Sequence, residues 1–168
     1  DEKFIEILKI FLPSYKFEKS ETPILIFKKT DLTSEHYNLN VTDKIEILYG
    51  DYLGARNAIA TLAQLILANS IKKCEIYDYP RFKTRSFMMD LARGIGRKEE
   101  IREVIIRLAM LKYNQLHLHM SDSQGFAWQS VKHPNLVGPR GDQYSMQYFK
   151  GLHELCVTLG IEIVPELD

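Results

Sequence analysis

The stretch DYPRFKTRSFMMDLARGIGRKEEIREVIIRLAMLKYNQLHLHMSD, residues 78–122, decides the fold of this chain. It contains an apolar run at 85–92, a helical pattern at 98–112 and an alternating run at 115–120. The helical pattern has apolar residues on one face and charges on the other, as in a helix that packs on a sheet. A strand, a helix and a second strand in this order predict a parallel βαβ unit.

The alternating run at 115–120 also predicts which side chains share a face. His117 and His119 fall on one side of the strand, and the leucines and methionine between them fall on the other. The carboxyl ends of parallel strands lie at the same edge of a sheet. We therefore expect Arg93, which follows the first strand, to lie beside residues 121–124, which follow the second. Enzymes of the α/β class hold their sites at this edge.

The rest of the chain predicts more α/β structure. Before residue 78 the pattern favours helices and strands, namely helices at 2–12 and 55–69 and strands at 24–28, 36–41 and 44–49, the last two joined as a hairpin. After residue 120 it favours a loop at 121–143, a helix at 144–159 and a strand at 161–167. We expect a small α+β domain at 1–77 and a second domain at 78–168, with 71–79 as the link.

Composition excludes few functions. The 22 basic residues balance the 22 acidic ones, so no long-range attraction draws the chain to nucleic acid or to an anionic membrane. No apolar run approaches the ~20 residues of a membrane span, and we expect no signal peptide in these residues; no compartment is predicted. Cys74 and Cys156 are expected to be buried free thiols, with a disulfide or a metal pair as the alternatives.

Ordered motifs then connect the chain to a known family. They are D-x-P-R-F-x-x-R from 78, M-x-D-x-A-R from 88, K-x-N-x-L-H-L-H from 112, D-x-Q-G-F from 122 and G-I-E-I-V-P-E-L-D from 160. This series resembles family 20 glycoside hydrolases, the β-N-acetylhexosaminidases. The pattern G-x-x-x-A-x-x-T-L-x-Q-L from Gly54 is similar to the domain that precedes the barrel in that family.

The resemblance implies a TIM-type barrel that is incomplete here. A whole (β/α)₈ barrel needs ~250 residues, and residues 78–168 can supply only its first three β/α units. The chain is expected to be a piece of a longer protein. Its last strand would leave an unpaired edge, so we expect self-association through that edge of the barrel.

The resemblance also implies an activity. Family members are retaining exo-hydrolases that release terminal N-acetylglucosamine or N-acetylgalactosamine from glycans without a cofactor, using the acetamido oxygen of the sugar as the nucleophile. The family's catalytic Asp-Glu pair is expected beyond residue 168. We therefore expect a hexosaminidase as the parent protein and an inactive 168-residue chain. The alternative is a non-catalytic carbohydrate-binding module or a self-associating half-barrel.

The resemblance to this family implies specific roles for two residues. Arg93 matches the arginine that binds ring hydroxyls of the terminal sugar, a task that suits the fixed fork of guanidinium donors. The alternative is an arginine that only braces Asp90 or Asp122. Asp122 matches an aspartate of the polar network that positions the catalytic acid, through a histidine expected beyond residue 168. The alternative for Asp122 is a cap for the turn that follows it.

Other polar residues are expected in the wall or network of the site. Two histidines two apart, such as His117 and His119, could bind a metal, but a third ligand is missing, so structural histidines are the preferred interpretation and no metal is expected. The expected wall or network residues are Asp90, His119, Glu166 and Asp168. Phe126 and Trp128 could stack on a sugar or pack locally.

Overall fold

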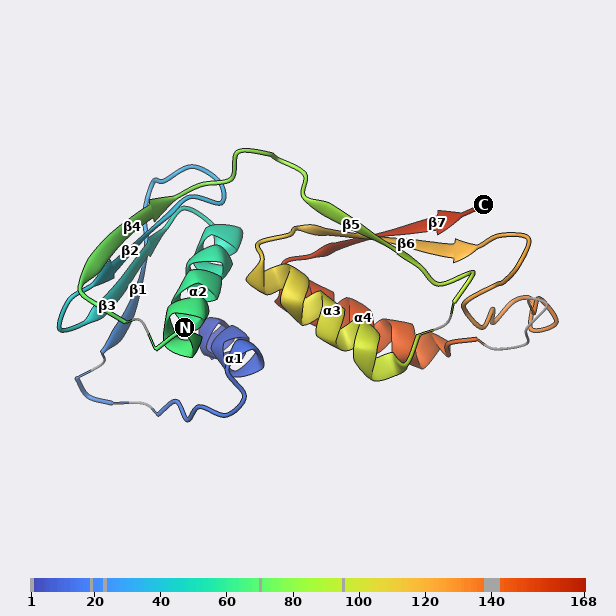
Figure 1. Ribbon diagram of the computed structural model, residues 1–168, viewed down its shortest axis with the longest axis horizontal. Helices are drawn as coiled ribbons and strands as arrows, with labels where there is room; N and C mark the ends of the chain where they lie inside the picture. Colours follow the sequence, from blue (N-terminus) through green and yellow to red (C-terminus); the bar gives the residue numbers. More distant parts are fainter. Residues whose placement is uncertain (1, 19, 23, 70, 95, 138–142) are drawn as a thin grey trace. The chain divides into compact units, whose positions relative to one another are not determined.

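The computed structural model describes residues 2–18, 20–22, 24–69, 71–94, 96–137 and 143–168. The chain divides into two compact units. The first contains residues 1–83 and 109–112, and the second contains 84–108 and 113–168. Each unit has its own sheet (Figure 1). Among the described residues, no helix combines the length and the apolar character that crossing a bilayer requires.

The first unit contains a four-stranded mixed sheet. In spatial order its strands are β1 (Leu25–Lys29), β3 (Ile45–Tyr49), β2 (Tyr37–Val41) and β4 (Cys74–Asp78). The predicted hairpin is confirmed, because β2 and β3 pair antiparallel. The predicted link at 71–79 is wrong, because β4 lies within it and pairs antiparallel with β2. This strand has five residues at the edge of the sheet, three half-buried and two exposed, so its pattern is weak.

Two helices cover one face of this sheet (Figure 1): α1 (Glu2–Phe11) and α2 (Tyr52–Leu67). The helix predicted at 55–69 begins three residues earlier because the Asp51 carboxylate accepts the Gly54 amide at 2.8 Å and caps the helix. Gly54 passes close to the preceding loop, and a Cβ there would lie 2.4 Å from the His36 carbonyl oxygen. The alternation in β2 sends Tyr37, Leu39 and Val41 into the core beneath the helices.

The second unit follows the predicted βαβαβ order. Its elements are β5 (Ser86–Asp90), α3 (Lys98–Met110), β6 (Gln115–Ser121), α4 (Met146–Thr158) and β7 (Glu162–Leu167). β6 lies between β5 and β7 and pairs parallel with both, as the sequence predicts. Within the described residues, β5 and β7 have no other strand partner.

Both helices of this unit lie on the same side of its sheet (Figure 1). Leu116 and Leu118 of β6 are buried on that side, at 0% and 1% exposure. The opposite side, called here the open face, receives the alternate residues of each strand. α3 ends two residues before the predicted position, because Lys112 takes a positive φ of 64° and turns the chain toward β6. The Ser145 hydroxyl caps α4 by accepting the Tyr148 amide at 3.2 Å.

The cysteines differ in their surroundings. Cys156 lies in α4 with 0% exposure, and burial raises the pKa of its thiol to about 12. Cys74 begins β4 and is only half-buried, so the prediction of two buried thiols is confirmed for Cys156 and wrong for Cys74. Both are free thiols.

Candidate functional site

Strand register places three ionisable residues in one row across the open face. Asp90 of β5 is the register partner of His119 in β6, and His119 is the register partner of Glu166 in β7. The flanking residues Leu118 and Pro165 point to the helix-covered side because side chains alternate along a strand. The row lies near the carboxyl ends of the strands, where the sequence predicted a site. The register therefore places Asp90 and Glu166 on the same face as His119.

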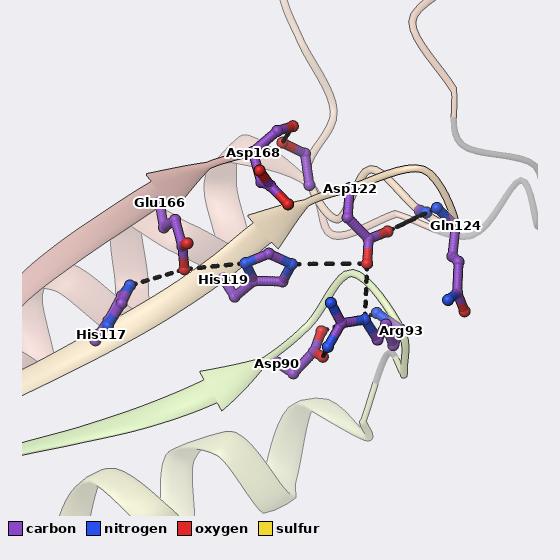
Figure 2. Close-up of polar contacts among 10 residues, drawn as sticks. Asp90, Arg93, His117, His119, Asp122, Gln124, Glu166 and Asp168 are labelled. Carbon is purple, nitrogen blue, oxygen red and sulfur yellow. Dashed lines mark hydrogen bonds and ion pairs between the residues drawn. The ribbon is translucent and has the colours of Figure 1, made fainter.

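One carboxylate joins the two histidines. Glu166 Oε2 lies 2.8 Å from His117 Nε2 and 2.9 Å from His119 Nδ1 (Figure 2). The predicted common face of His117 and His119 is thus confirmed. Sequence reasoning missed that Glu166 is their shared partner. The available signal was the two-residue spacing of the histidines on a strand that neighbours the Glu166 strand.

The two carboxylate oxygens of Asp122 contact different partners. Its Oδ1 accepts the backbone amides of Gln124 at 2.7 Å and Gly125 at 3.0 Å, which caps the turn after β6. Its Oδ2 lies 2.9 Å from Arg93 Nε and 3.6 Å from His119 Nε2 (Figure 2). The side chain is only 6% exposed. Asp122 therefore caps the turn, as the alternative interpretation predicts, and it also joins a polar network with Arg93 and His119.

Arg93 follows β5 and contacts two carboxylates. Its backbone amide donates to Asp90 Oδ1 at 2.9 Å, and its Nη1 lies 3.1 Å from Asp90 Oδ2. With Nε on Asp122, the guanidinium is fixed from two directions, yet the side chain remains 57% exposed. The predicted juxtaposition of Arg93 with residues 121–124 is confirmed. A cation with a fixed orientation and an open side can meet a polar ligand at this edge.

The charges of the site alternate in sign. The amide of Gln124, followed by that of Gly125 and the charge of Arg93, holds the pKa of Asp122 below its ordinary value. The hydrogen bond to Glu166 raises the pKa of His119 above its ordinary value. The same bond lowers the pKa of Glu166. The carboxylates are thereby kept ionised, and protonation of the imidazole between them is favoured.

The structure does not bring every expected residue into this network. The Ser121 hydroxyl donates to the main-chain oxygen of Asp168 at 3.4 Å. The carboxylate of Asp168 makes no hydrogen bond or ion pair with the described residues. Phe126 and Trp128 lie on the loop after β6 with ring centroids 4.0 Å apart and planes tilted by 34°, so they pack on each other.

A metal site has no support in the part of the chain that the structure describes. No group of three or more His, Cys, Asp or Glu side chains is arranged there to hold an ion. His117 and His119 instead direct one nitrogen each at Glu166. The site therefore presents the fixed guanidinium of Arg93, the buried carboxylate of Asp122 and a polar wall.

Comparisons with known proteins agree on one family. The family model described as "Glycosyl hydrolase family 20, catalytic domain" matches residues 82–168, and "Glycosyl hydrolase family 20, domain 2" matches residues 7–79. A beta-hexosaminidase of Akkermansia muciniphila is 30% identical over 156 residues and aligns with 82% of this chain. The chain spans 32% of that relative.

Solved structures show the same likeness. An exo β-N-acetylglucosaminidase from Vibrio harveyi, solved in complex with N-acetylglucosamine, matches with a TM-score of 0.90 and 27% identity. It covers 99% of this chain, which spans 31% of that protein. A β-N-acetylhexosaminidase from Bacteroides fragilis matches 99% of the chain with a TM-score of 0.86 and 29% identity, and the chain spans 38% of it. These matches confirm the predicted fold class, an α+β domain followed by the start of a TIM-type barrel.

Proposed function

Because this chain belongs to glycosyl hydrolase family 20, we propose that the protein containing it is a β-N-acetylhexosaminidase. The proposed substrates are glycans that end in N-acetylglucosamine or N-acetylgalactosamine. The observation that carries the proposal is the pairing of Arg93 and Asp122 at the carboxyl ends of two neighbouring parallel strands, with Nε and Oδ2 2.9 Å apart. In a barrel enzyme this edge is the mouth of the site.

Arg93 has the proposed role of sugar binding. Its guanidinium offers up to five N–H donors in one plane, and its contacts with Asp90 and Asp122 restrict how that plane can turn. Because 57% of the side chain is exposed, donors can reach a hydroxyl group of a bound sugar. Preorganisation of this kind reduces the entropy lost on binding. Asp122, buried and ionised, has the proposed role of supporting the network around the site.

The proposed reaction is retaining and substrate-assisted. The acetamido oxygen of the sugar attacks the anomeric carbon, the glycosidic C–O bond breaks, and the leaving oxygen takes a proton from a carboxylic acid. Water then opens the cyclic intermediate and restores the acetamido group. The acid and its aspartate partner are proposed to lie on a barrel strand beyond residue 168. Residues 78–168 would contribute the sugar-binding wall, and residues 1–77 would form the preceding non-catalytic domain.

The test compares two chromogenic substrates with the longer protein. 4-Nitrophenyl N-acetyl-β-glucosaminide should be hydrolysed, and 4-nitrophenyl β-glucoside should not, because the glucoside lacks the acetamido nucleophile. Equal hydrolysis of the two would contradict substrate assistance. The 168-residue chain should hydrolyse neither substrate, and measurable turnover by the chain alone would contradict the placement of the acid beyond residue 168.

A second candidate is a carbohydrate-binding module without catalysis. It is favoured by the same exposed, anchored Arg93, since a fixed guanidinium can bind a sugar whether or not an acid stands nearby. Calorimetric titration of the 168-residue chain with N-acetylglucosamine tests this. Saturable binding that Arg93→Ala abolishes, together with an inactive longer protein, would favour the module over the enzyme.

A further inference from the structure

We propose that His119 acts as an imidazolium that positions Asp122, and through it Arg93, for the sugar site. The inference rests on the proposed function for its role, but the charge state of His119 is a separate property of this chain. It assigns a positioning task to a histidine that the sequence analysis expects, without a specific role, in the wall or network of the site.

Each ring nitrogen of His119 faces a carboxylate. Nδ1 of His119 lies 2.9 Å from Glu166 Oε2, and Nε2 lies 3.6 Å from Asp122 Oδ2 (Figure 2). The side chain is 8% exposed, and Nε2 is buried with no hydrogen-bond partner among the described residues. Solvent is therefore not available to satisfy that nitrogen.

Neither neutral tautomer suits this setting. With the proton on Nδ1, the lone pair of Nε2 would face the Asp122 carboxylate. With the proton on Nε2, the lone pair of Nδ1 would face Glu166 at hydrogen-bond distance. Only the doubly protonated ring directs an N–H at both carboxylates.

Nearby charges favour the same state. Ionisable groups approach the row of Asp90, His119 and Glu166 from each of the three strands and from the loops after β5 and β6; they are Asp90, Arg93, His117, Asp122 and Glu166. Three of them are carboxylates and only Arg93 is a permanent cation, so a positive His119 reduces the excess of negative charge. The hydrogen bond to Glu166 correspondingly raises the pKa of His119.

Asp122 Oδ2 then lies against two cations. Arg93 Nε approaches it at 2.9 Å and His119 Nε2 at 3.6 Å, while Oδ1 is held by the turn amides. Loss of the imidazolium charge would leave Arg93 as the main anchor of that oxygen. The carboxylate that fixes the guanidinium plane would then itself be less firmly placed, and the sugar would lose a preorganised donor. Positioning by the imidazolium is therefore complete at low pH and is lost as the pH rises through the raised pKa of folded His119.

The first test measures the ring directly in the 168-residue chain. Two-bond ¹H–¹⁵N correlation spectra of the imidazoles at pH 7 should show two protonated nitrogens for His119. Exposed His153 of α4 serves as the reference ring in the same spectrum. In Glu166→Gln the His119 resonances should titrate at lower pH. A bare ring nitrogen on His119 at pH 7 would overturn the proposal whatever the activity of the longer protein.

The second test measures the positioning role in the longer protein. His119→Gln keeps a hydrogen-bonding side chain but removes the charge, so kcat/KM should fall about tenfold, mainly through KM. The fall in kcat/KM of the unsubstituted protein above the pKa of His119 should disappear. His153 lies on α4, away in sequence from the residues of the site, so His153→Gln should leave kcat/KM unchanged. The positioning role would be refuted if His119→Gln left kcat/KM unchanged and kept the fall in kcat/KM at high pH.

The two tests separate the two proposals. Absence of hydrolysis in the unsubstituted longer protein would refute the proposed function, and the spectra would still decide the charge state of His119. Hydrolysis together with a neutral His119 would uphold the proposed function and refute this inference.

Discussion

Replacing Tyr37 with phenylalanine tests the polar cluster inside the first unit. The Tyr37 side chain is 1% exposed, and its hydroxyl donates to Asp78 Oδ2 at 2.9 Å. The Tyr37 hydroxyl oxygen also lies 2.7 Å from the Thr61 hydroxyl and accepts a hydrogen bond from Lys112 Nζ at 2.9 Å. Lys112 also forms an ion pair of 2.7 Å with Asp78. Tyr37→Phe removes the oxygen at the centre of these contacts without changing the shape of the ring.

The expected loss follows from the contacts removed. A neutral hydrogen bond contributes about 1 kcal/mol and one to a charged group about 1.5–3 kcal/mol. The Lys112–Asp78 ion pair survives and compensates in part, so the net loss should be about 2 kcal/mol. With a urea slope of about 2 kcal/mol/M, the unfolding midpoint should fall by about 1 M.

Urea unfolding followed by circular dichroism provides the assay. Tyr77→Phe is the matched control, because Tyr77 is 57% exposed on the same sheet and should change stability by less than about 0.5 kcal/mol. Burial acts to raise the pKa of Asp78, but the hydrogen bonds from Lys112 and Tyr37 outweigh it and lower that pKa. This stabilisation is present above the unfolded pKa of Asp78 and is lost as the pH falls through the folded value. Tyr37→Phe within 0.5 kcal/mol of the parent chain at pH 7 would refute the reasoning.

Three further predictions concern the second unit. Ser145→Ala should destabilise the chain by about 1 kcal/mol because it removes the cap of α4, whereas Ser145→Asp should retain it; equal losses in the two variants would contradict the capping role. Cys156, at 0% exposure, should react with a thiol reagent only on unfolding. Reaction of Cys156 in the native chain at the rate of Cys74 would contradict its burial. The edges of β5 and β7 have no strand partner in the described parts of the chain and should make the 168-residue chain self-associate; sedimentation velocity showing one monomeric species at all concentrations would count against this.

The sequence predicted the second unit better than the first because its strands carry strong signals. Strict alternation at His117 and His119 specified the inner face, and the parallel βαβ order placed Arg93 beside Asp122. The edge strand β4 was missed because five residues at a sheet edge, none of them fully buried, produce little periodic contrast. The parallel pairing of β1 with β3 was also not predicted, since periodicity gives a strand its faces but not its neighbours.

The details of the site depend on distances that a pattern does not contain. Residue type indicated Asp122 as a turn cap and the family resemblance implied a network member; in the structure one oxygen accepts the turn amides and the other contacts Arg93. The bridge from Glu166 to both histidines depends on the register of β7 against β6. Asp168 shares the two-residue spacing with Glu166, but its carboxylate lies outside the network of described residues. Spacing along one strand therefore predicts a shared face but not a contact.

The central claim is that Arg93, held beside Asp122, binds a hydroxyl group of a terminal amino sugar. The most direct measurement is kcat/KM of the longer protein and its Arg93→Ala variant on a chromogenic N-acetylglucosaminide and on analogues that each lack one ring hydroxyl. Removing the charged donor should lower kcat/KM at least tenfold on the full substrate, and much less on the analogue whose missing hydroxyl is the one that Arg93 binds. Equal kcat/KM for the variant and the unsubstituted protein on the full substrate would contradict the claim.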